Sequence, residues 1–327
     1  SNLASGLSTT ADWTFCNFEG NFGAINLLAA NGVDEPRKWN GSTLSTISGM
    51  PAGLNFICTH SNRVYGAVGY NLWASALRDA EDWSDPDPYV GAVEIPIETD
   101  DGAPIIALEA GFRHLMIFKE RSFYELWGTD PENYYAEPVA EDIGILSNKA
   151  VTTVQGVVYF VGRDAVYMYN GGRPRYDFAL PMREYFKNLN MAQKSKVVAG
   201  GNKKSLYVAL PIGNATDPDT ILEYDTEFQV WYIWKDYKPL HYAAAGDDFY
   251  VGDANGRVLK LGGTTDGGLA IQWEWVSVPF GGGSYAQRLQ WYRMWYVVDI
   301  PSGSSMNVYL SPSAEGDSDW QLVKSIT

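Results

Sequence analysis

One pattern recurs six times along this chain and limits its fold more than any other feature. Each unit has an apolar, β-forming segment, a polar turn, and a second such segment that ends in an aromatic residue and often a glycine. The second segments begin about 44 residues apart on average between Lys38 and Val258. The six pairs are Ile25–Ala30 with Arg37–Gly41, Phe56–Tyr65 with Leu72–Ser75, Leu115–Phe118 with Phe123–Gly128, Val157–Val161 with Val166–Gly171, Leu206–Leu210 with Ile221–Trp234, and Phe249–Val251 with Arg257–Gly262.

A hairpin repeat of this length predicts a β-propeller, because one small sheet cannot bury both of its faces whereas sheets packed around an axis can. We therefore predict an all-β fold with a propeller of about six blades over residues 1–265. Five or seven blades remain alternatives, because two of the steps between units are long. Thr14–Phe18 is expected to join the last blade and close the ring, and Asp177–Lys196 is predicted to insert a short amphipathic helix between blades four and five.

The pattern changes after the glycine-rich stretch at 262–268. Ile271–Val278, Arg293–Val298 and Met306–Leu310 alternate between polar and apolar residues, as half-buried strands do. These segments predict a small antiparallel, β-sandwich-like module over residues 266–327.

The formal net charge of −15 argues against a surface that binds nucleic acid, because such surfaces are basic. We therefore expect no sequence-specific nucleic-acid binding. We also expect no membrane span, because the sequence contains no apolar stretch of about 18 residues. Cys16 and Cys58 have neither metal-ligand spacing nor the pattern of a disulfide framework, so they are interpreted as buried free thiols.

The sequence offers little support for catalysis. His60, His114 and His241 each stand without a His or Cys partner nearby in sequence, and neither a G-x-S-x-G elbow nor a glycine-rich phosphate loop occurs. We therefore predict no catalytic, cofactor-binding or metal-binding residue, no cofactor, and a protein that is not an enzyme.

The alternative is a carbohydrate-active propeller, either a glycosidase or a lectin. A glycosidase needs paired carboxylates, and the acids that lie inside predicted strands are Glu109, Glu125, Glu223 and Glu274. The aromatic platforms for a sugar would be Trp73, Trp127, Trp231 and Trp234. Clustered carboxylates at the propeller axis would favour this alternative over a scaffold.

Four phrases of the chain resemble, in order and spacing, propeller phrases in virion proteins of tailed bacteriophages. They are Asn31–Gly41; His60–Tyr65 with Leu72–Ser75 and Glu81–Trp83; Phe118–Gly128; and Gly144–Gly171. The resemblance covers roughly residues 23–262.

The resemblance implies a non-enzymatic structural protein of a phage tail or of the neck beside the portal, of the nozzle, hub or stopper type. Such proteins assemble around the DNA path by protein–protein contact. The implied partners are other tail or neck proteins and further copies of this chain in a ring, and the implied location is the virion after synthesis in the bacterial host cytoplasm. Related proteins continue beyond the point that corresponds to Thr327, so an incomplete second module is expected.

Assembly contacts of such a protein are expected from aromatic-rich segments outside the hairpins, because interface centres are rich in Trp, Tyr and Arg. The candidate interface residues are Trp83, Tyr89, Tyr134, Tyr135, Trp291, Arg293 and Trp295. For the run 290–296 the alternative is that one strand face forms the core of the second module, since an isolated sheet must bury one face.

Overall fold

The computed structural model describes residues 4–97, 102–111, 113–235, 237–263, 265–266, 268–277, 295, 297–300, 302–311 and 319–326. The chain divides into two compact units, Ser1–Gly268 and Leu269–Thr327. The boundary predicted from sequence lies between residues 265 and 266.

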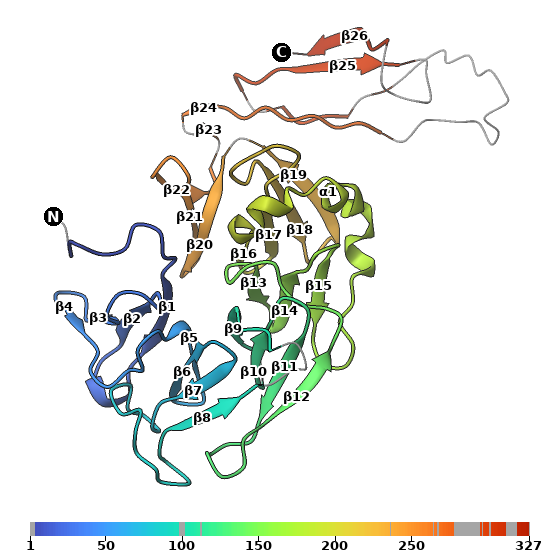
Figure 1. Ribbon diagram of the computed structural model, residues 1–327. Coiled ribbons are helices and arrows are strands. Elements are labelled where there is room, and N and C mark those ends of the chain that lie inside the picture. The colour runs from blue at the N-terminus through green and yellow to red at the C-terminus, as the bar shows by residue number, and fades with distance from the viewer. Residues whose placement is uncertain are drawn as a thin grey trace. The chain divides into compact units, whose positions relative to one another are not determined.

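Six antiparallel sheets follow one another along the first unit and are the blades of a β-propeller, which confirms the predicted fold (Figure 1). Blades one to three are β1 (Thr14–Phe18), β2 (Asn26–Ala30), β3 (Arg37–Trp39) and β4 (Leu44–Thr46); β5 (Asn55–His60), β6 (Arg63–Val68), β7 (Asn71–Ala74) and β8 (Val93–Pro96); and β9 (Ala107–Ala110), β10 (Leu115–Phe118), β11 (Phe123–Trp127) and β12 (Tyr135–Ala140). Blades four to six are β13 (Val151–Val154), β14 (Val157–Val161) and β15 (Val166–Tyr169); β16 (Val198–Gly201), β17 (Ser205–Leu210), β18 (Thr220–Asp225) and β19 (Val230–Trp234); and β20 (Pro239–Ala245), β21 (Asp248–Asp253) and β22 (Val258–Leu261).

The first strand of each blade lies innermost. Strand β1 contacts β5, β5 contacts β9, and the series continues through β13 and β16 to β20. Because the strands of each blade pair in chain order, every later strand lies further from the axis. The turn between the first and second strands therefore falls on the same face of the propeller in every blade.

Hydrophobic clusters fill the spaces between neighbouring blades. One cluster joins blades one and two, a second joins blades two and three, a third spans blades three to five, and a fourth joins blades five and six. In the third cluster Phe118 and Phe123 stack with ring centroids 5.2 Å apart, and Phe160 of blade four packs 5.1 Å from Phe118. Residues on both faces of these strands are therefore apolar, as blades packed on two sides require.

The expectation that Thr14–Phe18 closes the ring on the last blade is wrong. This segment is β1, and it pairs with β2 from Thr14 opposite Ala30 to Phe18 opposite Asn26. A hairpin with a short connection costs less loop-closure entropy than pairing with a strand more than 200 residues away. The N-terminal strand thus belongs to blade one.

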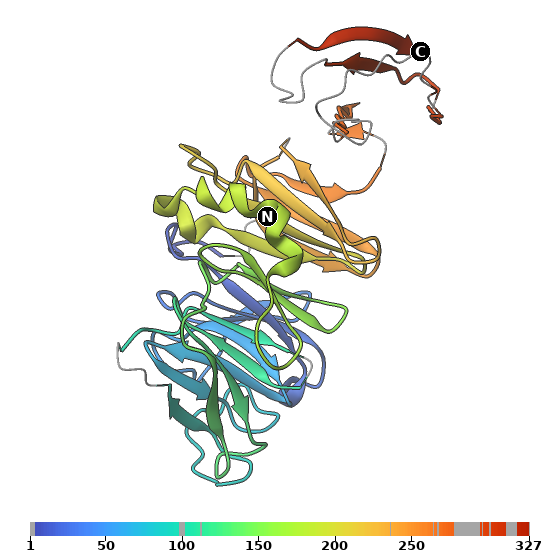
Figure 2. The same ribbon diagram turned by 90° about the vertical axis from the view of Figure 1, so that its right-hand side faces the viewer.

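The predicted helical insert is present between blades four and five. It consists of η2 (Asp177–Met182), α1 (Arg183–Lys187) and η3 (Met191–Lys196), which Figure 2 shows as yellow-green coils gathered on one side of the strands. Phe186 and Leu189 are buried in the large cluster, whereas Leu180 is 50% exposed. Of the residues that indicated an apolar face, Phe186 and Leu189 are therefore buried, whereas Leu180 faces solvent; η3 buries no residue.

In the second unit, β25 (Met306–Leu310) pairs with β26 (Gln321–Ile326) in an antiparallel hairpin. Two short strands, β23 (Thr265–Asp266) and β24 (Leu269–Ala270), form a further two-stranded sheet. Met306–Leu310 is thus a strand as predicted, but residues 271–277 are not assigned to a strand.

Candidate functional site

The structure corrects one of the predicted interface residues. Trp83 is 5% exposed and packs in the cluster between blades one and two, where its indole N–H donates to the carbonyl of Ala80 at 2.8 Å. The acidic residues around Trp83 predicted that its side chain lies at the surface, but the side chain is instead buried among apolar residues between the two blades. Trp83 therefore belongs to the core and presents no surface to a partner.

Tyr89 lies in the same loop and is 62% exposed. The backbone of this loop is held by Arg63, which is fully buried. The Arg63 guanidinium donates hydrogen bonds to the carbonyls of Ser75 at 2.7 Å, Tyr89 at 2.9 Å and Gly91. A charged donor with three carbonyl partners anchors the loop backbone, so Tyr89 is an exposed side chain on an ordered support.

Tyr134 and Tyr135 are adjacent in sequence but have different surroundings. The hydroxyl groups of Tyr134 and Tyr65 are hydrogen bonded at 2.9 Å, across blades three and two. Tyr135 begins β12, is 54% exposed, and stacks on Trp127 with ring centroids 6.4 Å apart. Tyr135 is therefore available at the surface, whereas Tyr134 links two blades.

The remaining predicted residues belong to the second unit. Trp295 is 83% exposed. Trp291 and Arg293 lie outside the described residues, so their interface assignment stays a prediction.

Sequence analysis did not predict an exposed apolar strand at the outer edge of blade five. Strand β19, the outermost strand of blade five, exposes 39–48% of Val230, Tyr232 and Ile233, with Trp234 at 37%. Phe228, in the turn before it, is 70% exposed. The uninterrupted run of five apolar residues at 230–234 could have indicated this surface. In a strand packed between two blades such a run predicts burial, but β19 is the outer edge strand of its sheet and remains exposed.

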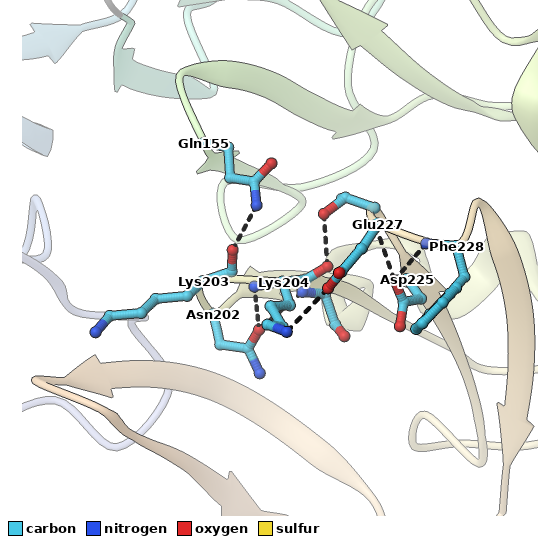
Figure 3. A network of polar contacts seen from close by, with 9 residues as sticks. Gln155, Asn202, Lys203, Lys204, Asp225, Glu227 and Phe228 are labelled. Carbon is cyan, nitrogen blue, oxygen red and sulfur yellow. Dashed lines mark hydrogen bonds and ion pairs between the residues drawn. The ribbon is translucent and has the colours of Figure 1, made fainter.

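A polar network orders the turn that carries Phe228 (Figure 3). The Asp225 carboxylate accepts the backbone N–H groups of Glu227 and Phe228 at 2.8 and 2.9 Å. The Lys204 ammonium donates to Glu227 at 2.9 Å, and Gln155 of blade four donates to the Lys203 carbonyl at 2.7 Å. Turns of neighbouring blades are thus tied together, and the exposed Phe228 stands on a fixed backbone.

The innermost strands of blades one to three bring Cys16, Cys58 and Glu109 close together. The pKa of Cys58 is raised by burial first and by the nearby Glu109 carboxylate second, and burial also raises the pKa of Glu109. The Thr153 hydroxyl on β13 donates to Glu109 at 2.7 Å. Within the described residues this axial site holds one carboxylate between thiols and a hydroxyl.

The other acids found by sequence do not join Glu109. Glu125 accepts the Tyr169 hydroxyl at 2.9 Å, and Glu223 accepts the Tyr207 hydroxyl and the Trp234 indole N–H, both at 2.8 Å. Glu274 is exposed in the second unit. Glu125 thus links blades three and four, whereas the contacts of Glu223 lie within blade five.

Two of the four tryptophan platforms of the carbohydrate alternative, Trp127 and Trp231, are covered by other rings, whereas Trp234 is 37% exposed. The His114 ring lies against Trp127 with centroids 3.9 Å apart and the planes tilted by 32°, and Tyr135 stacks on the same indole. Trp231 lies between Phe178 and Tyr224 at 5.8 and 4.9 Å. A sugar ring needs a free aromatic face, so neither indole offers the expected platform.

One pocket of about 290 Å³ lies between blades two and three. The turn after β5, the turn after β9, the end of β11 and the loop that follows it supply its walls. The lining residues are His60, Ser61, Tyr65, Arg113, His114, Leu126, Trp127, Gly128, Thr129 and Tyr134. Sequence analysis treated His60 and His114 as isolated residues, but the two equivalent turns of successive blades bring both to this pocket.

Burial lowers the pKa of His60, and the neighbouring His114 imidazole adds to this effect. Burial and the Tyr134 hydroxyl raise the pKa of Tyr65. At neutral pH the His60 imidazole is therefore neutral, and Tyr65 keeps its phenol hydroxyl.

Among the described residues no group of three or more His, Cys, Asp or Glu side chains has the arrangement of a metal site. In the same residues no helix has the length and apolar character needed to cross a bilayer.

No family model and no curated protein matches the chain. Among solved structures, BamB from Moraxella catarrhalis is 11% identical, with 79% of this chain and 72% of that chain covered and a TM-score of 0.46. The extracellular domain of a protein described as a hybrid two-component system from B. thetaiotaomicron is 10% identical, with 75% and 31% covered and a TM-score of 0.46. A protein described as exported from Bacteroides fragilis is 11% identical, with 76% and 86% covered and a TM-score of 0.41. Likeness at this level says nothing about function, which has to come from this chain's own residues.

Proposed function

We propose that this chain is a non-enzymatic structural protein that works by protein–protein contact, and that it belongs to the tail or neck of a tailed bacteriophage. The first part rests on the exposed strand β19 with Phe228. Soluble monomers seldom expose several large apolar side chains along one strand, and such exposure marks a surface that another protein covers. The second part rests on the resemblance of the four sequence phrases.

Two features of the blade support a docking role for β19. The Asp225 and Lys204 contacts hold the preceding turn, so a partner would meet a preordered surface and lose little entropy on binding. The strand is also the last of its sheet, so its outer backbone groups can pair with an additional strand.

The assembly test compares a double variant, Tyr232→Ser with Ile233→Ser, with the single variant Val258→Ser on β22. Val258 is 76% exposed and serves as a matched apolar residue on another outer strand. We expect the unaltered chain to form oligomers by light scattering and electron microscopy, alone or with its neighbouring virion proteins. The double variant should lose them while its thermal unfolding stays nearly unchanged, and Val258→Ser should assemble normally.

If the double variant assembles to the same extent as the unaltered chain, β19 does not have the proposed role in assembly. The phage assignment has a separate test, because portal and terminase genes should lie beside the gene that encodes this chain. A genomic neighbourhood without virion genes would overturn that assignment and leave the assembly result standing.

A further inference from the structure

Five of the six blades protect their outer strand against pairing with another sheet. Strand β4 has only three residues, and on β15 the backbone of Met168 already pairs with Arg175 on the outer side. Charged or proline residues interrupt the other three outer strands; they are Glu94 and Pro96 in β8, Glu137 and Pro138 in β12, and Lys260 in β22. Short length, charge, proline and a covering segment all keep an edge from adding a further strand.

Strand β19 has none of these protections. Its five residues, Val230–Trp234, include neither a charged residue nor a proline. Within the described part of the chain no backbone bridge joins its outer edge. An apolar edge that stays open while the other five are protected indicates that this edge receives another strand.

The charges at the two ends of β19 differ in sign. Asp225 and Glu227 precede the strand, and although Lys204 pairs with Glu227, this end keeps an excess of negative charge. Lys235 and Lys238 follow the strand, both are exposed, and among the described residues neither ammonium forms an ion pair. A second strand of the same sequence would bring like charges together if it ran parallel. If it ran antiparallel, each acidic end would lie beside a basic end.

We propose that β19 pairs with β19 of a second copy of this chain, antiparallel and about a two-fold axis at Tyr232. The proposal rests on the assembly role of β19 given above and names the partner. With the axis at the centre of the strand, Val230 lies opposite Trp234 of the second copy, and Trp231 lies opposite its Ile233. All five residues of β19 are then paired, and the two four-stranded blades become one continuous sheet.

Two-fold pairing uses the same edge on both copies, so it stops at two chains and does not propagate into a filament. The unaltered chain, studied without any other protein, should therefore have the mass of two chains in sedimentation equilibrium.

The charge pattern is tested with Lys235→Glu, which places like charges at both ends of the pair. This variant should dimerise about tenfold more weakly, because two surface ion pairs are each replaced by a repulsion. Arg173→Glu is the matched control. Arg173 is exposed in the loop after β15, and its replacement makes the same change in charge, so it should dimerise normally.

Disulfide cross-linking tests the direction and the register of the strands. Each cysteine variant is first shown to dimerise by sedimentation and is then treated with oxidised glutathione, which takes up the two electrons and two protons of the thiol pair. Tyr232→Cys should link to itself across the two-fold axis. Val230→Cys and Trp234→Cys should not link when alone but should link when mixed, because opposite residues on antiparallel strands lie about 5 Å apart. Val258→Cys on β22 controls for random collision.

Three results would overturn the proposal. They are a monomeric unaltered chain at micromolar concentration, equal dimerisation of Lys235→Glu and Arg173→Glu, and linkage of Val230→Cys to itself but not to Trp234→Cys, as parallel strands would give. A monomer that needs β19 to bind another virion protein would assign the edge to that protein and leave the proposed function standing. The proposed function itself fails by a different result, namely normal assembly of the Tyr232→Ser and Ile233→Ser double variant.

Discussion

Tyr169 and Glu125 stand 44 residues apart, and the phenol of Tyr169 donates a 2.9 Å hydrogen bond to the Glu125 carboxylate between blades four and three. Thr153 and Glu109 are separated by the same 44 residues and make a 2.7 Å bond between the innermost strands of these blades. The separation equals the mean repeat of the sequence. Equivalent positions of successive blades are therefore joined by side chains as well as by apolar packing.

The Tyr169–Glu125 bond makes a stability prediction. Tyr169→Phe removes the donor and leaves a carboxylate that is 9% exposed without this partner, which should lower the free energy of unfolding by about 1–3 kcal/mol. Tyr176→Phe is the control, because Tyr176 is 48% exposed. Urea unfolding followed by tryptophan fluorescence measures both, and equal stability of the two variants would contradict the role of the bond.

Substitutions at the two ends of the loop from Trp83 to Tyr89 should have opposite effects on stability and assembly. Trp83→Ala opens a cavity between blades one and two and should cost about 3–5 kcal/mol of stability. Tyr89→Ala changes an exposed side chain and should alter stability by no more than about 0.5 kcal/mol. If Tyr89 contributes to assembly, only the second variant will unfold normally and yet assemble poorly in light scattering. A strongly destabilised Tyr89→Ala would show that its ring packs within the unit.

Blade six should lose stability in acid through Asp253. Its carboxylate accepts the Arg257 guanidinium at 2.6 and 2.9 Å and the backbone N–H groups of Asn255 and Arg257, and the Arg257 bond is the main reason that its pKa falls from 3.8 to about 2. Since the folded pKa is the lower one, the stabilisation is present above pH 3.8 and disappears as the pH falls towards 2.

Thermal unfolding at intervals between pH 5 and pH 2 measures this effect. Asp253→Asn should be less stable at pH 5 and should show a smaller decline towards pH 2 than the unaltered chain. Parallel declines for the two proteins would show that other carboxyl groups dominate acid unfolding.

The two thiols should react slowly in the folded protein. Burial raises the pKa of Cys16 from 9.0 to about 11, so the reactive thiolate is about a hundredfold scarcer near pH 8 than for an ordinary thiol. Cys58 has its pKa raised as well, by burial and by Glu109. Iodoacetamide labelling followed by mass spectrometry should be slow for both in buffer and fast in urea. Rapid native labelling would mean that the axial strands open readily.

Much of the fold could be predicted because period and alternation are local properties of the sequence. The six hairpins and the helical insert follow from them. The strand that pairs with Thr14–Phe18 could not be predicted in this way, because pairing depends on the competition between a strand nearby in sequence and a distant one. The burial of Trp83 was missed for a related reason, since an acidic loop conceals a side chain that points inwards.

The surfaces were harder to predict than the blades. In β19 a run of large apolar residues marks exposure rather than burial, and only its edge position reveals this. The pocket unites His60 and His114, which lie at equivalent turns of successive blades. His60 ends β5, whereas His114 directly precedes β10, so aligning the repeat units does not place the two histidines at matching positions and gives no signal for the pocket.

The order of the hydrophobic clusters has a mechanical consequence. Blades two to five each pack against a hydrophobic cluster on both faces. In the described residues no such cluster joins blade six to blade one. Asp12, which precedes β1, forms an ion pair at 3.1 Å with Lys149, just before β13 of blade four. Heat or tension should therefore fray the molecule from its two outer blades inwards, leaving blades three to five as the last part to lose amide protection.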